Sequence, residues 1–330
     1  MVLFSRAMFA AIVATSLAVS AGSSRAQTYP DRPVRMIVPI AAGSVTDVII
    51  RAAAAEIGQK LGQQLVIENK GGAAGIPGAQ ACAQAIPDGH TLCLVYHSTL
   101  SINPLLFNKL PYDADNDFVP ITNLFLLVEA LFVNTSLSVD TVAELKTLAK
   151  QRPNAFNYGT LGPGSYPDLF LRWMNKEWGV EIVGIPYRGG GPIAQELVGG
   201  QLQIAKVGLG NFLGLIGTGK IKPLAVSSPK RSPLLPDVPT FVETRLGFPG
   251  FGWWGLAAPK GTPQPVVDKV NAAFVAVFKD PKFMDFLEKQ AVVPAAGSQA
   301  EFLAFLKQDR QNAEVLIKIA NTQRSDYKSE

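Results

Sequence analysis

Short apolar runs alternate with stretches of helical periodicity between residues 29 and 100. A compact apolar run bounded by turn residues indicates a buried strand, and a longer stretch with apolar residues on one face indicates a helix. The predicted strands span 34–38, 65–69 and 91–96, and the predicted helices span 46–61 and 77–85. Strands that alternate with helices in this way form a parallel sheet with helices on both faces.

The same alternation returns in the second half of the chain. The predicted strands there span 155–159, 181–186, 203–207 and 221–227, and the predicted helices span 141–150, 166–178, 192–198, 263–279, 280–289 and 298–320. The chain therefore contains two α/β units, each expected to be doubly wound.

Two extended segments are expected to connect these units. The apolar run 118–134 is longer than a typical strand, and 251–259 is a second run of this kind. Two crossings between two α/β lobes describe a hinged clamshell. We assign residues 27–124 and 255–330 to the first lobe and residues 125–254 to the second.

The composition is that of a globular protein with a sizeable core. Hydrophobic residues make up 48% and charged residues 17% of the 330 residues, which excludes a disordered chain. The formal net charge of +4 is small and spread along the sequence. Because no basic stripe with interleaved aromatic residues is present, we expect no nucleic-acid partner.

The first 26 residues have the features of a signal peptide. Arg6 precedes an apolar segment, 7–22, and Ser24-Arg25-Ala26 places small residues at the −3 and −1 positions of a cleavage site. The mature protein would begin at Gln27. No later apolar run is long enough to span a membrane, so we expect a soluble exported protein.

Cys82 and Cys93 are the two cysteines of the chain. Export to an oxidising compartment would allow a disulfide between them. The alternative is a pair of separate buried thiols that behave as small hydrophobic residues. The sequence leaves both interpretations open, because it does not give the Cβ geometry that a disulfide needs.

No catalytic or metal-binding signature is recognisable. The chain has no HExxH, GxSxG, Walker or CxxC motif, and it has only two histidines. We therefore expect no catalytic residue, no bound metal and no cofactor. His97 ends a predicted strand, where open α/β sheets place their ligands, although a lone histidine there more often has a structural role.

What recurs instead is a small-residue loop between a strand and a helix. Such loops span 41–46, 71–76, 160–165 and 188–191, two in each predicted lobe. In the first, Thr46 and Asp47 offer oxygens that can cap the helix, and free N–H groups of the first turn favour an anion. Loops that face each other across a cleft would present backbone donors to a ligand with carboxylates. The alternative is a set of ordinary turns, since glycine is a common turn residue.

Trp253 and Trp254 are neighbours in the second crossing segment. Successive side chains of an extended chain point to opposite faces. At most one of the two can therefore line the cleft, and the other is expected in the core.

Several motifs, in order along the chain, match one family. They are Tyr29-Pro30-Asp31-Arg32-Pro33, the loop from Val38 to Asp47, Glu68-Asn69-Lys70, Pro87-Asp88-Gly89-His90-Thr91-Leu92, Ile102-Asn103-Pro104, Leu110-Pro111-Tyr112-Asp113, Pro186-Tyr187-Arg188-Gly189 and the segment from Lys230 to Thr240. On these residues the chain resembles the Bug family, the periplasmic substrate-binding receptors of tripartite tricarboxylate transporters. The resemblance runs from about Tyr29 to the C-terminus.

The resemblance implies the α/β periplasmic-binding-protein (Venus flytrap) fold, in which two doubly wound lobes are joined by crossing strands. It implies that one small carboxylate is held between the lobes. It also implies delivery of the ligand to integral-membrane permease subunits. We expect the receptor to be a monomer. The positions that match the ligand-binding segments of the family are Ile40, Ala41, Ala42, Gly43, Ser44, Val45, Thr46, Asp47, His97, Ser98, Thr99, Thr160, Gly164, Ser165, Tyr187, Arg188, Gly189 and Gly190.

Some positions depart from the family pattern. Ile40 stands where an aromatic residue is usual, and Ser44 and Val45 stand where the pattern is richer in glycine. Because a β-branched residue resists positive φ, Val45 leaves the loop conformation open. The segment 206–208 reads Lys-Val-Gly where many members have Phe-Asp-Asn. This change removes an acid from the cleft and adds a cation, which favours an anionic ligand over an amino acid.

The leading hypothesis is a solute receptor that delivers a small carboxylate to a transporter. A receptor that presents its closed form to a sensor kinase is the alternative, and the sequence does not separate the two. An exported hydrolase of the same shape would need a nucleophile–base pair, which is not recognisable. The effector domain of a transcription regulator shares the fold, but the export signal and the absence of a helix-turn-helix segment argue against it.

Overall fold

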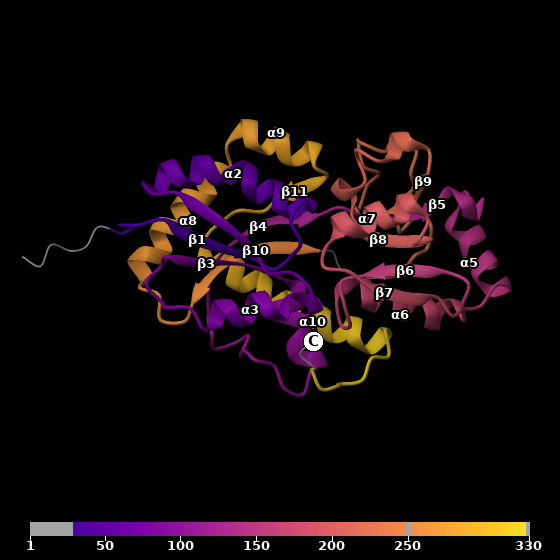
Figure 1. The fold of residues 1–330 in the computed structure, drawn as a ribbon, viewed down its shortest axis with the longest axis horizontal. Coiled ribbons are helices and arrows are strands. Elements are labelled where there is room, and N and C mark those ends of the chain that lie inside the picture. Colours follow the sequence, from indigo (N-terminus) through magenta and orange to yellow (C-terminus); the bar gives the residue numbers. More distant parts are fainter. Residues whose placement is uncertain (1–28, 249–251, 328–330) are drawn as a thin grey trace, which may run out of the picture.

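The computed structural model describes residues 29–248 and 252–327. Within these residues the first lobe has a six-stranded sheet with the order β11-β4-β10-β3-β1-β2 (Figure 1). Its strands are β1 (Val34–Val38), β2 (Leu65–Asn69), β3 (Thr91–Tyr96), β4 (Phe118–Leu127), β10 (Trp253–Pro259) and β11 (Val292–Pro294). Strand β1 is parallel to β2 and β3, whereas β10 is antiparallel to β3 and β4.

The second lobe repeats this plan. Its sheet, as far as the chain is described, has five strands in the order β7-β6-β8-β5-β9. They are β5 (Glu129–Asn134), β6 (Asn157–Thr160), β7 (Val183–Pro186), β8 (Ile204–Gly208) and β9 (Ile221–Val226). Strands β7, β6 and β8 are parallel, and they correspond to β2, β1 and β3 of the first lobe. The next strand, β5, is antiparallel to β8, just as β10 is antiparallel to β3 in the first lobe.

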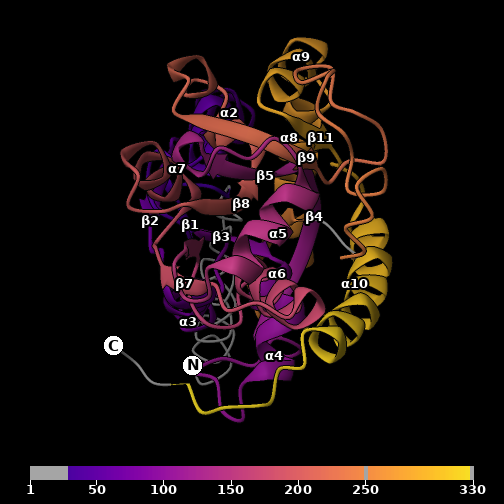
Figure 2. The same cartoon turned by 90° about the vertical axis from the view of Figure 1, so that its right-hand side faces the viewer.

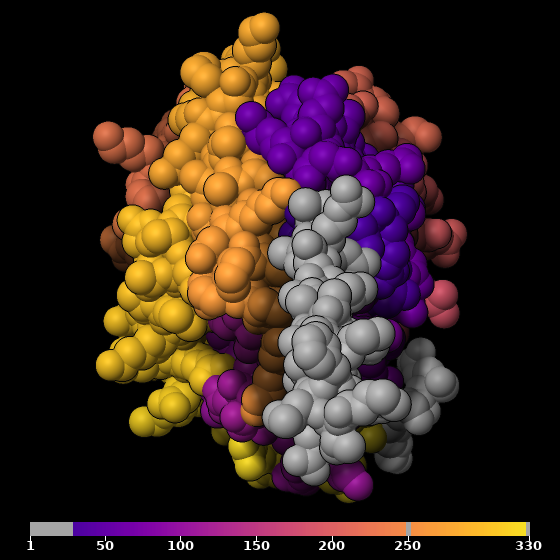
Figure 3. Space-filling model, turned by 90° about the vertical axis from the view of Figure 1, so that its left-hand side faces the viewer, coloured from indigo at the N-terminus to yellow at the C-terminus, as the bar shows by residue number. Residues whose placement is uncertain are grey.

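Helices cover the sheets as the periodicity predicts. They are α2 (Val45–Leu61), α3 (Ile76–Ala83), α4 (Asn103–Leu106), α5 (Val142–Gln151), α6 (Tyr166–Trp178), α7 (Gly190–Gly199), α8 (Gln264–Phe278), α9 (Pro281–Lys289) and α10 (Gln299–Ile319). Periodicity does not predict α4 or β11, because four and three residues are too few to show a period. At the outer end of the first lobe, Figure 3 shows the orange surface of the α8 region beside the purple surface of the α2 region, and α8 packs against α2.

In the described part of the chain, two connections link the lobes, from β4 to β5 and from β9 to β10. The crossings lie side by side, since the Leu127 N–H donates to the Gly252 carbonyl at 2.7 Å and the Ser227 N–H donates to the Glu129 carbonyl at 2.8 Å. Strands β4 and β10 belong to the first sheet over their whole length, so the boundaries placed at 124/125 and 254/255 fall inside these strands.

One pattern, Gly-Ser-x-x-Asp-x-x-x-Arg, begins a helix in each lobe. The two copies are Gly43, Ser44, Asp47 and Arg51 at α2, and Gly164, Ser165, Asp168 and Arg172 at α6. In both, the glycine has a positive φ, of 79° and 80°, and the serine is the N-cap residue. The aspartate accepts the glycine N–H at 2.9 Å, and the arginine Nε donates to it at 3.0 and 2.8 Å. The lobes therefore share a loop as well as a strand order.

Helix α10 lies along one side of the molecule (Figures 1 and 2), where it contacts β4 of the first lobe and α6 of the second. Trp253 of β10 packs edge-on against Phe302 and Phe305 of α10. On the second lobe, Lys176 of α6 donates through Nζ to the Ile319 carbonyl at 3.3 Å. The C-terminal helix thus belongs to the core that underlies both lobes.

Cys82 of α3 and Cys93 of β3 form a disulfide, with their Cα atoms 6.0 Å apart. Of the two interpretations that the sequence leaves open, the bridge is the one present. The bond ties α3, and with it the 71–75 loop that precedes this helix, to the sheet. A disulfide is typical of an oxidising compartment.

The described helices include none that is long and apolar enough to cross a membrane. The predicted signal peptide, 1–26, lies outside the described residues.

We predict that Gly255→Ala destabilises the packing of α10 on β10. A Cβ at this position would overlap atoms of the Phe302 ring, and overpacking a core costs about 1–3 kcal/mol. Thermal unfolding followed by circular dichroism should therefore give a lower Tm. The matched control is Gly199→Ala in α7, where an added Cβ meets no atom within 4 Å, and its Tm should be unchanged or higher. An unchanged Tm for Gly255→Ala would contradict the packing.

Candidate ligand-binding site

A cavity of about 30 Å³ lies where the two lobes meet. The residues that line it are Ile40, Ser44, Val45, Thr46, Tyr96, His97, Leu127, Glu129, Leu161, Pro167, Gly190, Val207, Gly208, Asn211 and Trp254. A water molecule needs about 10–15 Å³, whereas a typical ligand pocket has at least about 300 Å³. A carboxylate can therefore enter this cavity only when the lobes separate.

The β1–α2 loop brings the start of a helix to the cavity. Gly43 takes the positive φ, Ser44 is the N-cap residue, and α2 begins at Val45. The positive φ that a β-branched residue resists thus falls on a glycine, and Val45 lies inside the helix. The predicted cap is wrong, because Ser44, rather than Thr46 or Asp47, occupies the cap position and its side chain makes no capping hydrogen bond.

The Asp47 carboxylate holds this loop in shape. It accepts hydrogen bonds from the Gly43 N–H at 2.9 Å, from Arg51 Nε at 3.0 Å and from Asn69 Nδ2 at 2.8 Å. Burial alone would raise the pKa of Asp47, but the hydrogen bonds from Arg51, Asn69 and the Gly43 N–H hold it below its usual range. These contacts occupy the carboxylate, so Asp47 positions the loop and does not line the cavity.

Hydrogen bonds join the lobes directly across the cleft. They run from the Val45 N–H to Asn211 Oδ1 (2.9 Å), from the Gly191 N–H to Ser44 Oγ (3.3 Å), from the Ala41 N–H to the Arg188 carbonyl (2.9 Å) and from the Ala74 N–H to the Leu161 carbonyl (3.0 Å). The structure is therefore a closed form, in which three of these backbone donors of the first lobe find acceptors in the second and the Gly191 N–H of the second finds one in the first.

The side-chain amide of Asn211 lies against the start of α2, in a position that an anion can also occupy. Its amide oxygen accepts the Val45 N–H, and its amide nitrogen donates to the Gly208 carbonyl at 2.9 Å. The N–H groups at a helix start interact more favourably with a carboxylate than with a neutral amide. A carboxylate that enters the open cleft can therefore replace the Asn211 oxygen at this donor.

Small residues in the loops let the lobes approach each other. A Cβ at Gly189 would lie 2.5 Å from Ser44 Oγ and 2.9 Å from the Ala41 Cβ, and a Cβ at Gly71 would lie 2.7 Å from the Arg188 carbonyl oxygen. The sequence interpretation, that small residues admit a ligand close to the backbone, is thus incomplete. In the closed form they make room for the opposite lobe.

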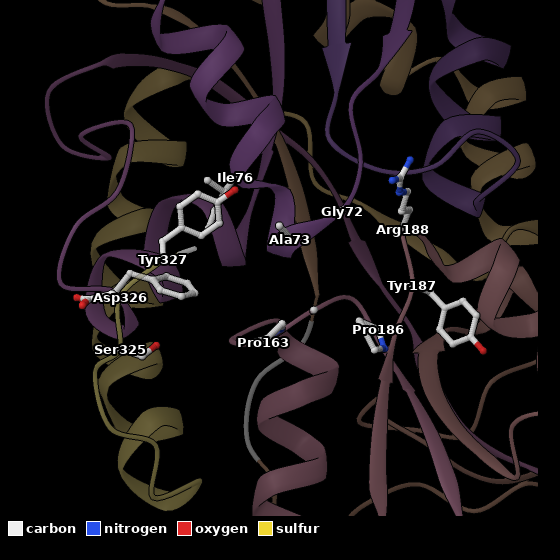
Figure 4. Close-up of a pocket in the computed structure, with 12 residues that line it drawn as sticks. Gly72, Ala73, Ile76, Pro163, Pro186, Tyr187, Arg188, Ser325, Asp326 and Tyr327 are labelled. Carbon is white, nitrogen blue, oxygen red and sulfur yellow. The ribbon is translucent and has the colours of Figure 1, made fainter. Parts of the chain in front are cut away.

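A wider groove of about 410 Å³ adjoins the cavity (Figure 4). Leu161 lines the cavity and the next residue, Gly162, lines the groove. The predicted residues Tyr187 and Arg188 lie here and do not line the cavity. Figure 4 shows both on the side of the groove opposite Tyr327.

His97 forms part of the cavity wall, whereas Ser98 and Thr99 do not. The imidazole packs edge-on against the rings of Tyr96 and Tyr166, each with its centroid 5.0 Å away. Burial, together with the charge of Lys206, lowers the pKa of His97 to about 3, so the ring is neutral near pH 7. The Thr99 hydroxyl is bonded to the backbone of Tyr96.

The β6–α6 loop bonds its side-chain hydroxyls internally, although its Leu161 carbonyl accepts the Ala74 N–H across the cleft. Ser165 Oγ donates to the Gly162 carbonyl at 2.7 Å and accepts the Asp168 N–H. Thr160 Oγ1 is bonded within the same region, to Gly162 and to the next strand. None of the three predicted residues Thr160, Gly164 and Ser165 lines the cavity.

The structure thus divides the predicted site residues into three groups. Six line the cavity, namely Ile40, Ser44, Val45, Thr46, His97 and Gly190. Two line the groove, Tyr187 and Arg188. The others support the loops without lining either space, and they are Ala41, Ala42, Gly43, Asp47, Ser98, Thr99, Thr160, Gly164, Ser165 and Gly189.

The prediction for the tryptophan pair is confirmed. Trp254 lines the cavity and stacks on Tyr96, with ring centroids 4.4 Å apart, while Trp253 faces α10. Sequence reasoning missed Glu129 and Asn211, which also line the cavity. No local motif marks these two residues, because they reach the cleft only through the strand order of the second lobe.

The sequence profile of the tripartite tricarboxylate transporter family receptor matches residues 49–322. The chain belongs to this family. BugT of Bordetella pertussis is similar to it, with 31% identity over 87% of this chain and 88% of BugT.

Two solved structures of the same kind are also similar. One is an R. palustris protein with adipate, at 30% identity and a TM-score of 0.85, covering 90% of this chain and 100% of that chain. The other is MatC from Rhodopseudomonas palustris with bound malate, at 31% identity and a TM-score of 0.82, covering 88% and 100%. The fold and the family predicted from the sequence are confirmed, and members of this family are periplasmic binding proteins.

In this receptor Lys206 does not add a free cation to the cleft. Its side chain is fully buried, and Nζ lies 2.5 Å from Glu129 Oε2. The ammonium also lies 4.0 Å from the centroid of the Tyr166 ring. Lys206 is absent from the cavity wall, and its partner Glu129 is the group that borders the cavity. The expectation that the lysine itself faces an anionic ligand is therefore wrong.

We predict that Asn211→Ala shifts the ligand-free receptor toward the open form. The variant loses the hydrogen bond from the Val45 N–H, and one such bond contributes about 0.5–1.5 kcal/mol. This corresponds to about a two- to tenfold change in the ratio of open to closed molecules. Small-angle X-ray scattering should give a larger radius of gyration. Asn312→Ala, at an exposed position of α10, is the matched control, and an equal radius for both variants would contradict the role of Asn211.

The contribution of Asp47 to stability should depend on pH. Because its folded-state pKa is lowered, the ionised carboxylate stabilises the protein above its unfolded-state pKa of about 3.9, and this stabilisation is lost as the pH falls through the lower folded-state value. Urea unfolding should show Asp47→Asn to be less stable than the wild type near pH 7. The difference in the free energy of unfolding should narrow as the pH falls below about 3.9. Asp237→Asn, at an exposed site outside the loop, serves as control, and a pH-independent difference for Asp47→Asn would contradict this account.

Proposed function

We propose that this protein is a receptor that captures a small carboxylate between its two lobes. The observation that carries the proposal is the Val45 N–H at the start of α2, which points across the cleft to an acceptor oxygen of the second lobe. A ligand carboxylate is a stronger acceptor at this position than the Asn211 amide. The relatives solved with adipate and with malate support a small carboxylate as the ligand.

The first-lobe contacts in this proposal come from the segment Ile40–Thr46, and the second-lobe contacts come from Leu161 and Gly190. All of these residues except Ala41, Ala42 and Gly43 border the closed cavity. The ligand enters the open cleft and replaces the hydrogen bonds that the lobes make with each other. A ligand that bonds both lobes binds the closed form better than the open form, and this difference in affinity shifts the population toward closure.

The location and the partner belong to the same proposal. We infer that residues 1–26 direct export, and that the receptor acts as a monomer in the periplasm. It hands its ligand, chemically unchanged, to the permease subunits of a tripartite tricarboxylate transporter. Membership of the receptor family supports this partner, and the Cys82–Cys93 disulfide supports an oxidising compartment.

We predict that small mono-, di- or tricarboxylates raise the Tm of the mature chain, 27–330, with increasing concentration. Ligand that binds only the folded form stabilises it by about 2.7 kcal/mol at a hundred times Kd. The screen is a thermal-shift assay, followed by titration calorimetry of each acid that responds. The neutral amides that correspond to each acid are the matched control, and they should not shift the Tm. The absence of a shift with every acid would contradict the carboxylate proposal.

A further inference from the structure

The wall of the cleft cavity carries one acidic side chain among its described lining residues, that of Glu129. Glu129 is the first residue of β5, directly after the crossing from the first lobe, and only 4% of its side chain is exposed. The other residues of the wall are apolar or uncharged, since His97 is neutral near pH 7. A carboxyl group therefore borders the space in which the ligand would lie.

Lys206 lies on the side of Glu129 away from the cavity. It is on β8, which pairs with β5, and none of its side chain is exposed. Its Nζ is surrounded by aromatic rings, with the Tyr166 and Phe170 centroids 4.0 and 5.1 Å away. Because Lys206 does not line the cavity, its ammonium group makes no direct contact with a ligand there, whereas Glu129 does border the cavity.

The lysine keeps Glu129 an acceptor. Its Nζ donates to Glu129 Oε2 at 2.5 Å, which makes that oxygen an acceptor. Burial leaves the pKa of Glu129 above and that of Lys206 below its usual value, because the charge and hydrogen bond of the partner oppose the effect of burial only in part. The Gly252 N–H also donates to the carboxylate. The pair adds no net charge to the cleft, and what it presents to the cavity is carboxylate oxygen, an acceptor without a proton to give.

We propose that Glu129 selects ligands that carry a hydrogen-bond donor, a hydroxyl or an ammonium group, beside their carboxylate. The ligand class is therefore hydroxy- or amino-carboxylates rather than unsubstituted acids. Lys206 is a positioning residue that fixes the Glu129 carboxylate. This inference rests on the proposed function and replaces the sequence expectation that position 206 disfavours amino acids.

The preference follows from what each ligand leaves unpaired. A donor on the ligand bonds the Glu129 oxygens, which otherwise lose contact with water when the lobes close. An unsubstituted acid places an apolar methylene group beside those oxygens, and the lone pairs that Lys206 and the Gly252 N–H do not use stay without a partner. A site built to bond a polar group of its ligand rejects an analogue that lacks this group.

Succinate, malate and aspartate test the proposal, because they share a four-carbon dicarboxylate skeleton and differ in having no donor, a hydroxyl or an ammonium group at one carbon. Propionate, lactate and alanine form the matching three-carbon series. Titration calorimetry of the wild-type receptor should show a donor-bearing acid to bind about ten- to a hundredfold more tightly than the unsubstituted acid of its series.

The double variant Glu129→Gln with Lys206→Met tests the assignment to this pair. It removes both charges together, so neither is left buried without its partner. The affinity ratio between donor-bearing and unsubstituted acid should collapse to within about threefold. A merely structural role would instead weaken all members of a series alike. Glu181→Gln, an exposed glutamate of the second lobe bonded to Asn154, is the matched control and should keep the wild-type ratio.

The outcomes separate this inference from the proposed function. If succinate, propionate or adipate binds the wild type as tightly as every donor-bearing acid, the selection by Glu129 is wrong while carboxylate binding stands. If no acid binds, both fail. A double variant that folds and keeps the wild-type ratio overturns the role of the pair. If the double variant does not fold, the single variant Lys206→Met is compared with the wild type instead. Its affinity ratio between donor-bearing and unsubstituted acid should be lower, because the Glu129 carboxylate is no longer held in position.

Discussion

The closed structure depends on backbone donors in the loops of the first lobe. Buried N–H groups must be paired, and those of Ala41, Val45 and Ala74 are paired with oxygens of the second lobe. When the lobes separate, these donors face water in the cleft. The groups that hold the lobes together are thus the same groups that an anionic ligand can use, which makes binding and closure one event.

The Gly-Ser-x-x-Asp-x-x-x-Arg loop occurs in both lobes, but the serine has a different role in each. In the second lobe the Ser165 hydroxyl is bonded inside its own loop, and the Leu161 carbonyl of this loop accepts the Ala74 N–H across the cleft. In the first lobe the Ser44 hydroxyl caps nothing and instead accepts the Gly191 N–H across the cleft. The aspartates keep one role in both copies. The first lobe therefore offers the serine of its loop to the cleft, while the second lobe keeps its serine inside the loop and offers a backbone carbonyl.

Much of the fold could be predicted, because strand and helix periods are local. The alternation of Trp253 and Trp254 is local too, and it correctly separates cavity from core. The site was harder to predict. Family motifs locate the loops, but they do not show which side chains turn inward, and Tyr187 and Arg188 lie in the neighbouring groove. The pairing of Glu129 with Lys206 joins positions 77 residues apart, and only the antiparallel register of β5 and β8 brings them together.

Stability alone does not account for this pair. Taking both charges out of water costs several kcal/mol per ion, and well-packed apolar residues at such positions are often as stable or more so. The aromatic rings around Lys206 form an environment in which an apolar side chain would pack well. What an apolar pair would lack is the carboxylate oxygen at the cavity wall, fixed by Lys206 on one side and by the Gly252 N–H next to the second crossing. Recognition of a ligand donor therefore requires a charge at this position, at the edge of the cleft and beside both crossings. Core packing does not require it.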